Sequence, residues 1–241
     1  MRALIIKEVR GFAASLIGAI TITVFLLLNG LFLWVFPQNV LELGYAELTP
    51  LFTLAPWVFL FLLPAVTMRS FSEERRTGTI ELLLTKPLTE MQVVLGKYAA
   101  ALALLVLALL PTLIYYWSIG QLAMPKGNVD SGAVWGSYIG LLMLGGCFAA
   151  IGLFASSITD NQIIAFLLAV FLCFFLFTGF DFLASYQAVG ALEGPLKALG
   201  IQEHYVSMSR GVIDLRDMVY FGGVIGIFLL LTRTALQSRT W

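Results

Sequence analysis

The segment RSFSEERRTGTIELLLTKPLTEMQVVLGK, residues 69–97, is the long polar interruption in a chain made mostly of hydrophobic stretches. Its five basic residues, Arg69, Arg75, Arg76, Lys86 and Lys97, alternate with glutamates. Basic residues close to the ends of membrane spans remain on the cytoplasmic side. We therefore expect residues 69–88 to form a cytoplasmic loop.

Part of this loop is expected to be a short helix. No Gly or Pro lies between Met68 and Thr77, so residues 69–77 can form about two helical turns. Gly78 can end that helix in a left-handed conformation, because it has no Cβ. Thr89 and Gln92 have the spacing of a capping box, which predicts that a helix restarts there and enters the membrane. The pattern indicates a short charged helix held between two spans, as a docking surface for a cytoplasmic partner requires.

The composition is that of a membrane protein. Hydrophobic residues make up 60% of the chain and charged residues 12%, whereas a soluble domain has about 25% charged residues. The net charge is zero, so nothing favours binding to nucleic acid. Cys147 and Cys173 lie in apolar stretches and indicate neither a disulfide framework nor a metal site.

The apolar stretches predict an all-α membrane protein, one domain over residues 1–241. Six spans are expected at residues 16–36, 48–68, 93–119, 135–157, 163–182 and 218–233, and the first is long enough to cross a core of about 30 Å. Residues 1–15 can form an amphipathic helix at the cytoplasmic interface, although a frayed basic N-terminus is an open alternative. Residues 184–217 are too polar to span and are expected on the outer side.

The distribution of charge gives the orientation. Ten of the 14 Lys and Arg residues fall on the side of the central loop in this topology: Arg2, Lys7, Arg10, Arg69, Arg75, Arg76, Lys86, Lys97, Arg233 and Arg239. Both termini are therefore expected in the cytoplasm. Membrane lipid is expected around the six spans.

Several residues within and beside the spans allow two interpretations. Pro56 and Pro64 can be hinges or static kinks, and Gly136 and Gly140 form a GxxxG pair that lets another helix approach closely. The Phe-rich stretch at residues 163–182 indicates contact with lipid, while a role in lining a pathway stays open. An outer polar cluster is expected to contain Asp181, Arg210, Asp214, Arg216 and Asp217. Of these, the four that lie just before the last span are expected to pair with one another and with Ser209. Asp181 can cap the interface or stand at the mouth of a pathway.

The sequence lacks the motifs of an enzyme. It contains no GxxxxGK[ST], HExxH or GxSxG, and His204 is its single histidine. We therefore expect no catalytic, metal or cofactor site on this chain. Charges inside the spans, the usual mark of an ion-driven carrier, are nearly absent. The energy for any transport is expected to come from another protein.

Residues 71–97, FSEERRTGTIELLLTKPLTEMQVVLGK, resemble the cytoplasmic loop of ABC-2-type transporter permeases. This resemblance implies the fold of type V exporters, with an N-terminal elbow helix and a coupling helix that sits in a groove of the ATPase. The residues that it assigns to ATPase coupling are Arg69, Phe71, Glu73, Glu74, Arg75, Arg76, Gly78, Thr79 and Glu81. Residues 205–241 are similar to the end of gliding-motility permeases of the GldF type, and more loosely to the copper-site-maturation permeases of nitrous oxide reductase.

The resemblance also implies partners and a location. They are an ABC ATPase dimer that carries ATP and Mg, and a second permease subunit, either a GldG-like chain or a second copy, in the bacterial inner membrane. The region between the last two spans would form short helices that dip into the outer leaflet. The expected role is a permease in a gliding-motility or secretion-associated complex. The alternative is a mechanical or regulatory scaffold without net transport. We expect Glu74→Arg to weaken ATPase recruitment while leaving insertion and folding intact.

Overall fold

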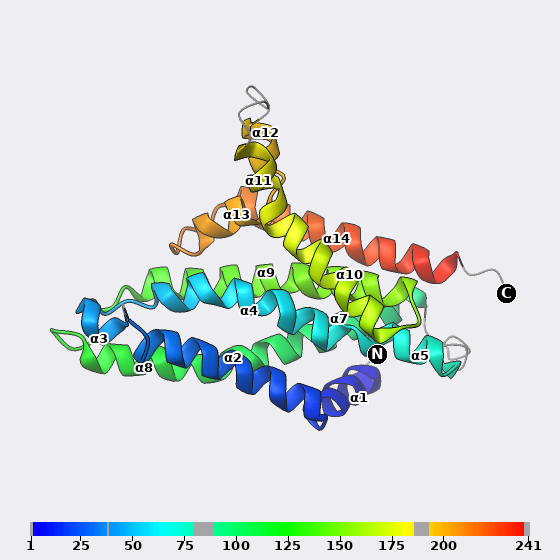
Figure 1. Ribbon diagram of the computed structural model, residues 1–241, viewed down its shortest axis with the longest axis horizontal. Helices are drawn as coiled ribbons and strands as arrows, with labels where there is room; N and C mark the ends of the chain where they lie inside the picture. Colours follow the sequence, from blue (N-terminus) through cyan, green and yellow to red (C-terminus); the bar gives the residue numbers. More distant parts are fainter. Residues whose placement is uncertain (1, 38, 80–88, 186–192, 239–241) are drawn as a thin grey trace.

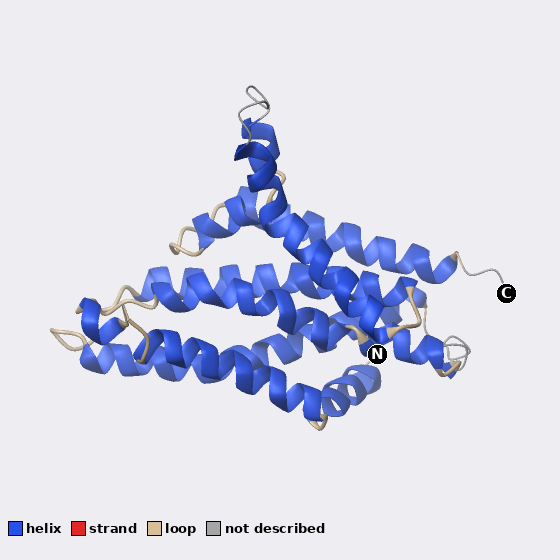
Figure 2. Ribbon diagram, in the orientation of Figure 1, coloured by secondary structure: helices blue, strands red, loops and turns tan. Residues whose placement is uncertain are grey.

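The computed structural model describes residues 2–37, 39–79, 89–185 and 193–238 (Figure 1). Within these ranges all regular elements are helical (Figure 2). Six segments are long and apolar enough to cross a membrane: Leu16–Trp34, Thr49–Arg76, Glu90–Leu122, Ser131–Ile158, Gln162–Ser185 and Leu215–Gln237. The chain is therefore a multi-pass membrane protein, and the predicted all-α, six-span fold is confirmed.

The helices form an elongated bundle with two distinct ends (Figure 1). At one end, here named the α5 end, lie α1 (Arg2–Ala13), α5 (Arg69–Arg76) and the last turns of α14 (Leu215–Gln237). The opposite end, the α3 end, contains α3 (Val40–Leu43) and the loop after α8 (Leu113–Leu122). Between them run α2 (Leu16–Trp34), α4 (Thr49–Thr67), α7 (Glu90–Leu109) and α9 (Ser131–Ile158). Segment α10 (Gln162–Phe174) crosses this bundle obliquely, and α11 (Phe180–Ser185) and α12 (Glu193–Lys197) project from its side.

Polar caps set where several spans begin. Thr89 Oγ1 accepts from Gln92 N, and Gln92 Oε1 accepts from Thr89 N, so the expected capping box is present. Asp130 caps α9 and Asp214 caps α14 in a similar way. These helices therefore begin at residues 90, 131 and 215, before the predicted 93, 135 and 218. The apolar stretch marks what the membrane covers, whereas the cap marks where the helix starts.

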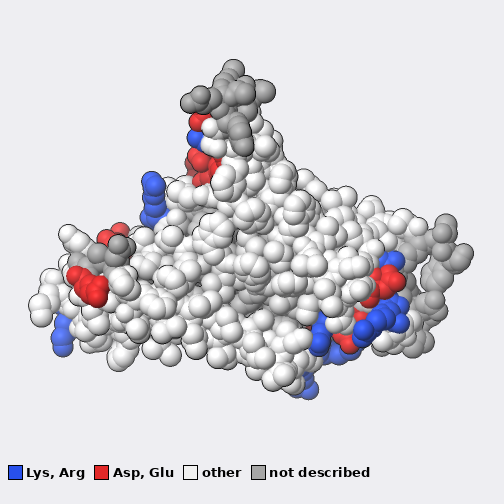
Figure 3. All heavy atoms as spheres, in the orientation of Figure 1, with Lys and Arg blue, Asp and Glu red and all other residues white. Residues whose placement is uncertain are grey.

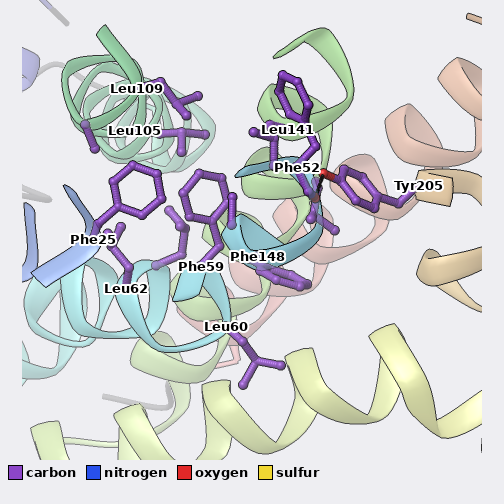
Figure 4. Close-up of a cluster of buried hydrophobic side chains, with 14 of the residues drawn as sticks. Phe25, Phe52, Phe59, Leu60, Leu62, Leu105, Leu109, Leu141, Phe148 and Tyr205 are labelled. Atoms are coloured by element: carbon purple, nitrogen blue, oxygen red, sulfur yellow. Dashed lines mark hydrogen bonds between the residues drawn. The ribbon is translucent and has the colours of Figure 1, made fainter. Parts of the chain in front are cut away.

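Helix α9 is the centre of the bundle, in contact with α4, α5, α7, α10, α13 (Ile201–Met208) and α14. Its small residues make this possible, since Gly145 lies against Leu105 and Gly152 lies against Thr67. Beside α9, apolar side chains from α2, α4 and α7 meet in a buried cluster (Figure 4). In that cluster the rings of Phe25 and Phe59 are 5.3 Å apart.

Irregular turns interrupt two of the spans. Pro111 lies in a 3₁₀ turn, Leu110–Thr112, which separates α7 from α8. A π-helical turn, Phe175–Gly179, lies between α10 and α11 and had no counterpart in the sequence prediction.

Helix α4 continues through both of its prolines. Pro56 has no amide hydrogen, so the carbonyl of Phe52 loses its usual partner within the helix. The hydroxyl of Tyr205, from α13, donates to this carbonyl at 2.6 Å. Burial raises the pKa of Tyr205, which keeps the hydroxyl protonated as a donor.

Helix α13 packs on the GxxxG pair of α9. A Cβ at Gly136 would lie 2.6 Å from Gly211 O, and one at Gly140 would lie 2.8 Å from Met208 Cβ. Ser137 Oγ donates to Ser209 O at 2.8 Å between these two glycines. Gly211 has a φ of +83°, which suits a residue without a side chain. The close approach predicted for this motif therefore involves the segment between the last two spans.

Candidate functional site

The candidate site is α5 and its attachments at the α5 end of the bundle. One residue, Met68, separates α5 from α4, and Thr77 follows its last turn. Phe71 is fully buried in a small apolar cluster with residues of α1, α7, α9 and α14. The other members are Leu4, Val93, Val94, Ala150, Leu153, Leu229 and Leu236. This burial fixes one face of α5 against the bundle.

Ser156 of α9 fixes the start of α5. Its hydroxyl accepts from Phe71 N at 3.0 Å and from Ser72 N at 3.1 Å, and it donates to Met68 O at 3.0 Å. Amides in the first turn of a helix lack carbonyl partners within the helix. A side chain from α9 supplies the acceptor here, so the start of α5 is bonded directly to the central helix.

Ser156→Ala is expected to lower the free energy of unfolding by about 1–3 kcal/mol, because buried amides lose an acceptor. We also expect faster tryptic cleavage at Arg76, which lies at the exposed end of α5. The measurement is thermal unfolding of the purified chain together with a time course of trypsin digestion. The matched control is Ser157→Ala, since among the described residues the Ser157 hydroxyl donates to Phe154 O of its own helix and to no other element. Equal behaviour of the two variants would contradict the role of Ser156.

Arg75 fixes the other end of α5. Its Nη1 donates to Ser157 O at 2.6 Å, and its Nε lies 3.9 Å from Asp160 Oδ1. The position of the Arg75 guanidinium at the last carbonyls of α9 is electrostatically favourable, because a helix C-terminus attracts positive charge. Both ends of α5 are therefore bonded to the last turns of α9.

Lys97 of α7 joins α5 to α1. Its ammonium is fully buried and lies 3.0 Å from Glu8 Oε1, 3.0 Å from Glu74 Oε1 and 2.6 Å from Ser70 O. It also lies 5.1 Å from the centre of the Phe71 ring. A buried charge requires partners of this kind, because the cost of desolvation is otherwise several kcal/mol. Lys97, Glu8 and Glu74 form what we name the Lys97 triad, which connects α1, α5 and α7.

Glu74 also forms an ion pair with Lys7 of α1. Its side chain is 13% exposed, and Lys7 of α1 lies 3.7 Å from the same oxygen that contacts Lys97. Its second carboxylate oxygen is buried without a hydrogen bond in the described part of the chain. Glu74→Arg would place a guanidinium against the Lys97 ammonium. These contacts therefore predict that the substitution destabilises the α5 end, in place of the intact folding expected from the sequence.

The opposite face of α5 is open. Arg69 and Arg76 are exposed and Glu73 is partly exposed, and their spacing places all three on one side of the helix. Thr77, Gly78 and Thr79 continue this exposed surface, and Gly78 has the left-handed φ, +68°, expected of the residue that ends the helix. We name Arg69, Glu73, Arg76 and Thr77 the outer face of α5. Charged side chains gather at this end of the molecule (Figure 3).

The structure thus divides the residues that the resemblance assigned to ATPase coupling. Phe71, Glu74 and Arg75 bind other helices of the chain, whereas Arg69, Glu73, Arg76 and Thr79 point outward or border the open face. Glu81 lies outside the described residues. Glu8 and Ser156 belong to no pattern in the sequence that indicates this role. Lys97 could have been recognised from the sequence, because a lysine among the apolar residues of a membrane span requires a carboxylate from another part of the chain.

The outer polar cluster is not held by pairing among its members. No ion pair in the described ranges joins two of Asp181, Arg210, Asp214, Arg216 and Asp217. The expected pairing is therefore not present as ion pairs, and the bond that two members share is a helix cap. Arg216 and Asp217 belong to the first turn of α14, and Asp214 Oδ1 caps that helix by accepting from Arg216 N at 3.0 Å.

Asp217 binds His204 instead. His204 Nδ1 lies 2.7 Å from Asp217 Oδ1, and Nε2 lies 3.0 Å from Ala198 O. The imidazole stacks on Tyr220, with 3.9 Å between the ring centres. This pair attaches α13 to α14. Asp181 lies on α11, where one of its carboxylate oxygens is buried without a hydrogen bond among the described residues.

Comparison with known proteins adds one finding. No curated protein matches the chain. The model of one protein family, described as ABC-2 family transporter protein, matches residues 58–205. The match runs from within α4 to Tyr205 in α13, more than half of the 241 residues, and it includes all of α5. The chain therefore belongs to the ABC-2 family of transporter proteins.

Proposed function

We propose that this chain is the membrane permease subunit in which α5 receives the motion of a separate ATPase and passes it to the spans. Membership of the family implies a membrane transport subunit without its own ATP site, working with an ABC ATPase. The observation that carries the proposal is the bonding of α5 to three helices at once, through Ser156, Arg75 and the Lys97 triad.

These bonds give α5 a mechanical role that a flexible loop lacks. A force on the outer face of α5 would act on α9 through Ser156 and Arg75, and on α1 and α7 through Lys97. Because α9 contacts most of the other spans, its displacement would alter the whole bundle. Packed helices shift between discrete arrangements, so a small displacement at one end can change the other.

A partner can bind at the outer face of α5. A cavity of about 410 Å³ opens beside it, between α1, α5 and α7, and its lining includes Lys7, Arg69, Glu73 and Thr79. Cations and carboxylates alternate there, which suits a polar groove or a charged side chain of a soluble protein.

The orientation follows from charge. Most basic residues among the described ranges lie at the α5 end, and the positive-inside rule would place that end, with both termini, in the cytoplasm. We propose the bacterial inner membrane as the location. The ATP and Mg would be bound by the ATPase dimer.

A second permease subunit would complete the pathway. Large apolar side chains remain exposed along α2, α10 and α14, and either lipid or another membrane subunit would cover them. We propose a GldG-like chain or a second copy of this chain as that subunit. The similarity of residues 205–241 to GldF-type permeases supports a gliding-motility or secretion-associated complex.

Replacing both Arg69 and Arg76 by Glu is expected to reduce recovery of the ATPase with the permease by about tenfold or more, because losing one partner of a buried interfacial charge pair costs about 2–5 kcal/mol. The measurement is co-purification of the ABC ATPase that accompanies the wild-type chain from native membranes. Arg233→Glu is the matched control, since Arg233 is exposed on the last turns of α14. Undiminished recovery from a correctly inserted double variant would contradict the proposal.

A further inference from the structure

His204 faces a hydrogen-bond acceptor with each of its two ring nitrogens. Nδ1 lies 2.7 Å from Asp217 Oδ1, and Nε2 lies 3.0 Å from Ala198 O, in the turn between α12 and α13. A carboxylate oxygen and a backbone carbonyl can only accept. A neutral imidazole has one N–H and can satisfy one of them, whereas an imidazolium donates from both nitrogens. Both bonds therefore form only when His204 is protonated.

Loss of the proton would break one particular bond of the two. The remaining hydrogen is expected on Nδ1, because a hydrogen bond to an ionised carboxylate is stronger than one to a neutral carbonyl. Nε2 would then face Ala198 O without a hydrogen between them. The His204 side chain is 16% exposed and that of Asp217 is 10% exposed, so the ring is shielded and can still exchange its proton with water.

A second bond on the same turn does not respond to pH near neutrality. The hydroxyl of Tyr220, from α14, donates to Leu199 O at 2.6 Å, and its ring stacks on the imidazole. A tyrosine hydroxyl keeps its proton at neutral pH, whereas an imidazole changes charge between about pH 5 and pH 8. The turn is therefore held by one constant bond and one proton-dependent bond.

Other charged groups lie on the elements around this pair. They are Asp181 of α11, Glu193 and Lys197 of α12, Glu203 of α13 and Arg216 of α14. Glu193 and Lys197 pair with each other at 2.8 Å. Helix α9 and the π-helical turn, which also pack on α13, contain no charged residue. Any pH effect that these groups produce must persist when His204 is replaced.

The turn at residues 198–200 connects the projecting helices to the bundle. Helix α12 packs on α11, and the two project from the side of the molecule (Figure 1). Helix α13, on the other side of the turn, is held to α4 by Tyr205 and to α9 by Ser137. Loss of the bond to Ala198 would therefore loosen α12 while α13 stays in place.

We propose that His204 is a proton-dependent clamp, which fixes α12 to α13 and α14 in acid and releases it as the pH rises. The clamp goes beyond the proposed coupling function and does not depend on an ATPase. With the α5 end in the cytoplasm, as proposed above, the clamp would respond to the pH on the outer side of the membrane.

Nitrogen NMR of the ring tests the protonation directly. His204 is the single histidine of the chain, so ring-¹⁵N histidine in the full chain, purified with a tag that lacks histidine, reports this group alone. In nanodiscs at about pH 5.5 both ring nitrogens should carry a hydrogen, and at about pH 8.5 only Nδ1 should. A ring that is neutral at the lower pH, or that keeps its hydrogen on Nε2 at the higher pH, would overturn the proposal.

Amide hydrogen exchange of residues 198–200 measures the clamp itself, because these amides donate to carbonyls of α12. After correction for the intrinsic effect of pH, their exchange rate should rise about tenfold between the two pH values, since a hydrogen bond from a charged donor is lost. His204→Gln should give equal corrected rates at both. The matched control, Tyr220→Phe, removes the constant bond to Leu199 O and should raise both rates while keeping the tenfold difference.

Two exchange results would overturn the proposal. Equal corrected rates in the wild-type chain would show that the bond to Ala198 holds nothing. A tenfold rise that persists in His204→Gln would assign the effect to the neighbouring charged groups. Neither result involves α5, so a failure of the clamp is distinguishable from a failure of the coupling role.

Discussion

Lys97→Met is expected to lower the free energy of unfolding by about 3 kcal/mol and to loosen α1 and α5 from α7. Removing one partner of a buried ion pair costs about 3–5 kcal/mol, because the remaining charge stays desolvated. Here two carboxylates, on Glu8 and Glu74, would face each other without the ammonium that separates them. The lower end of the range applies, since the Glu8 side chain is 24% exposed and water can reach it.

Thermal unfolding in detergent and trypsin digestion measure this effect. Lys126→Met, which removes an exposed lysine at the α3 end, is the control and should behave like wild type. The double variant Lys97→Met with Glu74→Gln should recover part of the loss, because it removes one of the opposed charges. If Lys97→Met unfolds like wild type, the Lys97 triad does not hold these helices together.

Gly136→Val is expected to displace α13 from α9 and to destabilise the chain by about 2 kcal/mol or more. Overpacking of a well-packed contact costs about 1–3 kcal/mol, and backbone atoms cannot yield as a flexible side chain does. A Cβ at Gly136 would lie 2.6 Å from Gly211 O and 2.7 Å from Gly211 Cα. The hydrogen bonds of Ser137 to Ser209 and of Tyr205 to Phe52 would be strained or lost with the same movement.

Amide hydrogen exchange over residues 201–211, together with thermal unfolding, reports this displacement. The matched control is Gly222→Val in α14, where a Cβ would have no neighbouring atom within 4 Å among the described residues. Valine is a better helix former than glycine, so the control should be neutral or slightly stabilising. Unchanged protection of residues 201–211 in Gly136→Val would show that close packing on the GxxxG pair does not hold α13.

The sequence was sufficient for features that depend on local chemistry. The six helices follow from the length of the apolar stretches, the start of α7 from Thr89 and Gln92, and the end of α5 from Gly78. Each depends on residues close together in the chain, so pattern and spacing decide it.

The direction of charged side chains on α5 depends on distant residues and could not be predicted. Glu74 and Arg76 lie two residues apart in one charged stretch, yet Glu74 binds Lys97 and Arg76 is exposed. The difference comes from where α1 and α7 pack. The same is true of His204, whose partner Asp217 is brought to it by the packing of α13 on α14.

Photocrosslinking from the outer face of α5 tests the coupling role most directly. A photoreactive phenylalanine analogue at Thr77, which is exposed beside Arg76, would be activated in native membranes, with Lys126 at the α3 end as the control position. If α5 receives the ATPase, Thr77 should give an adduct with a protein that carries an ATP-binding P-loop, and Lys126 should not. If Thr77 gives no ATPase adduct while the complex can still be co-purified, the ATPase binds elsewhere and α5 is not the coupling helix.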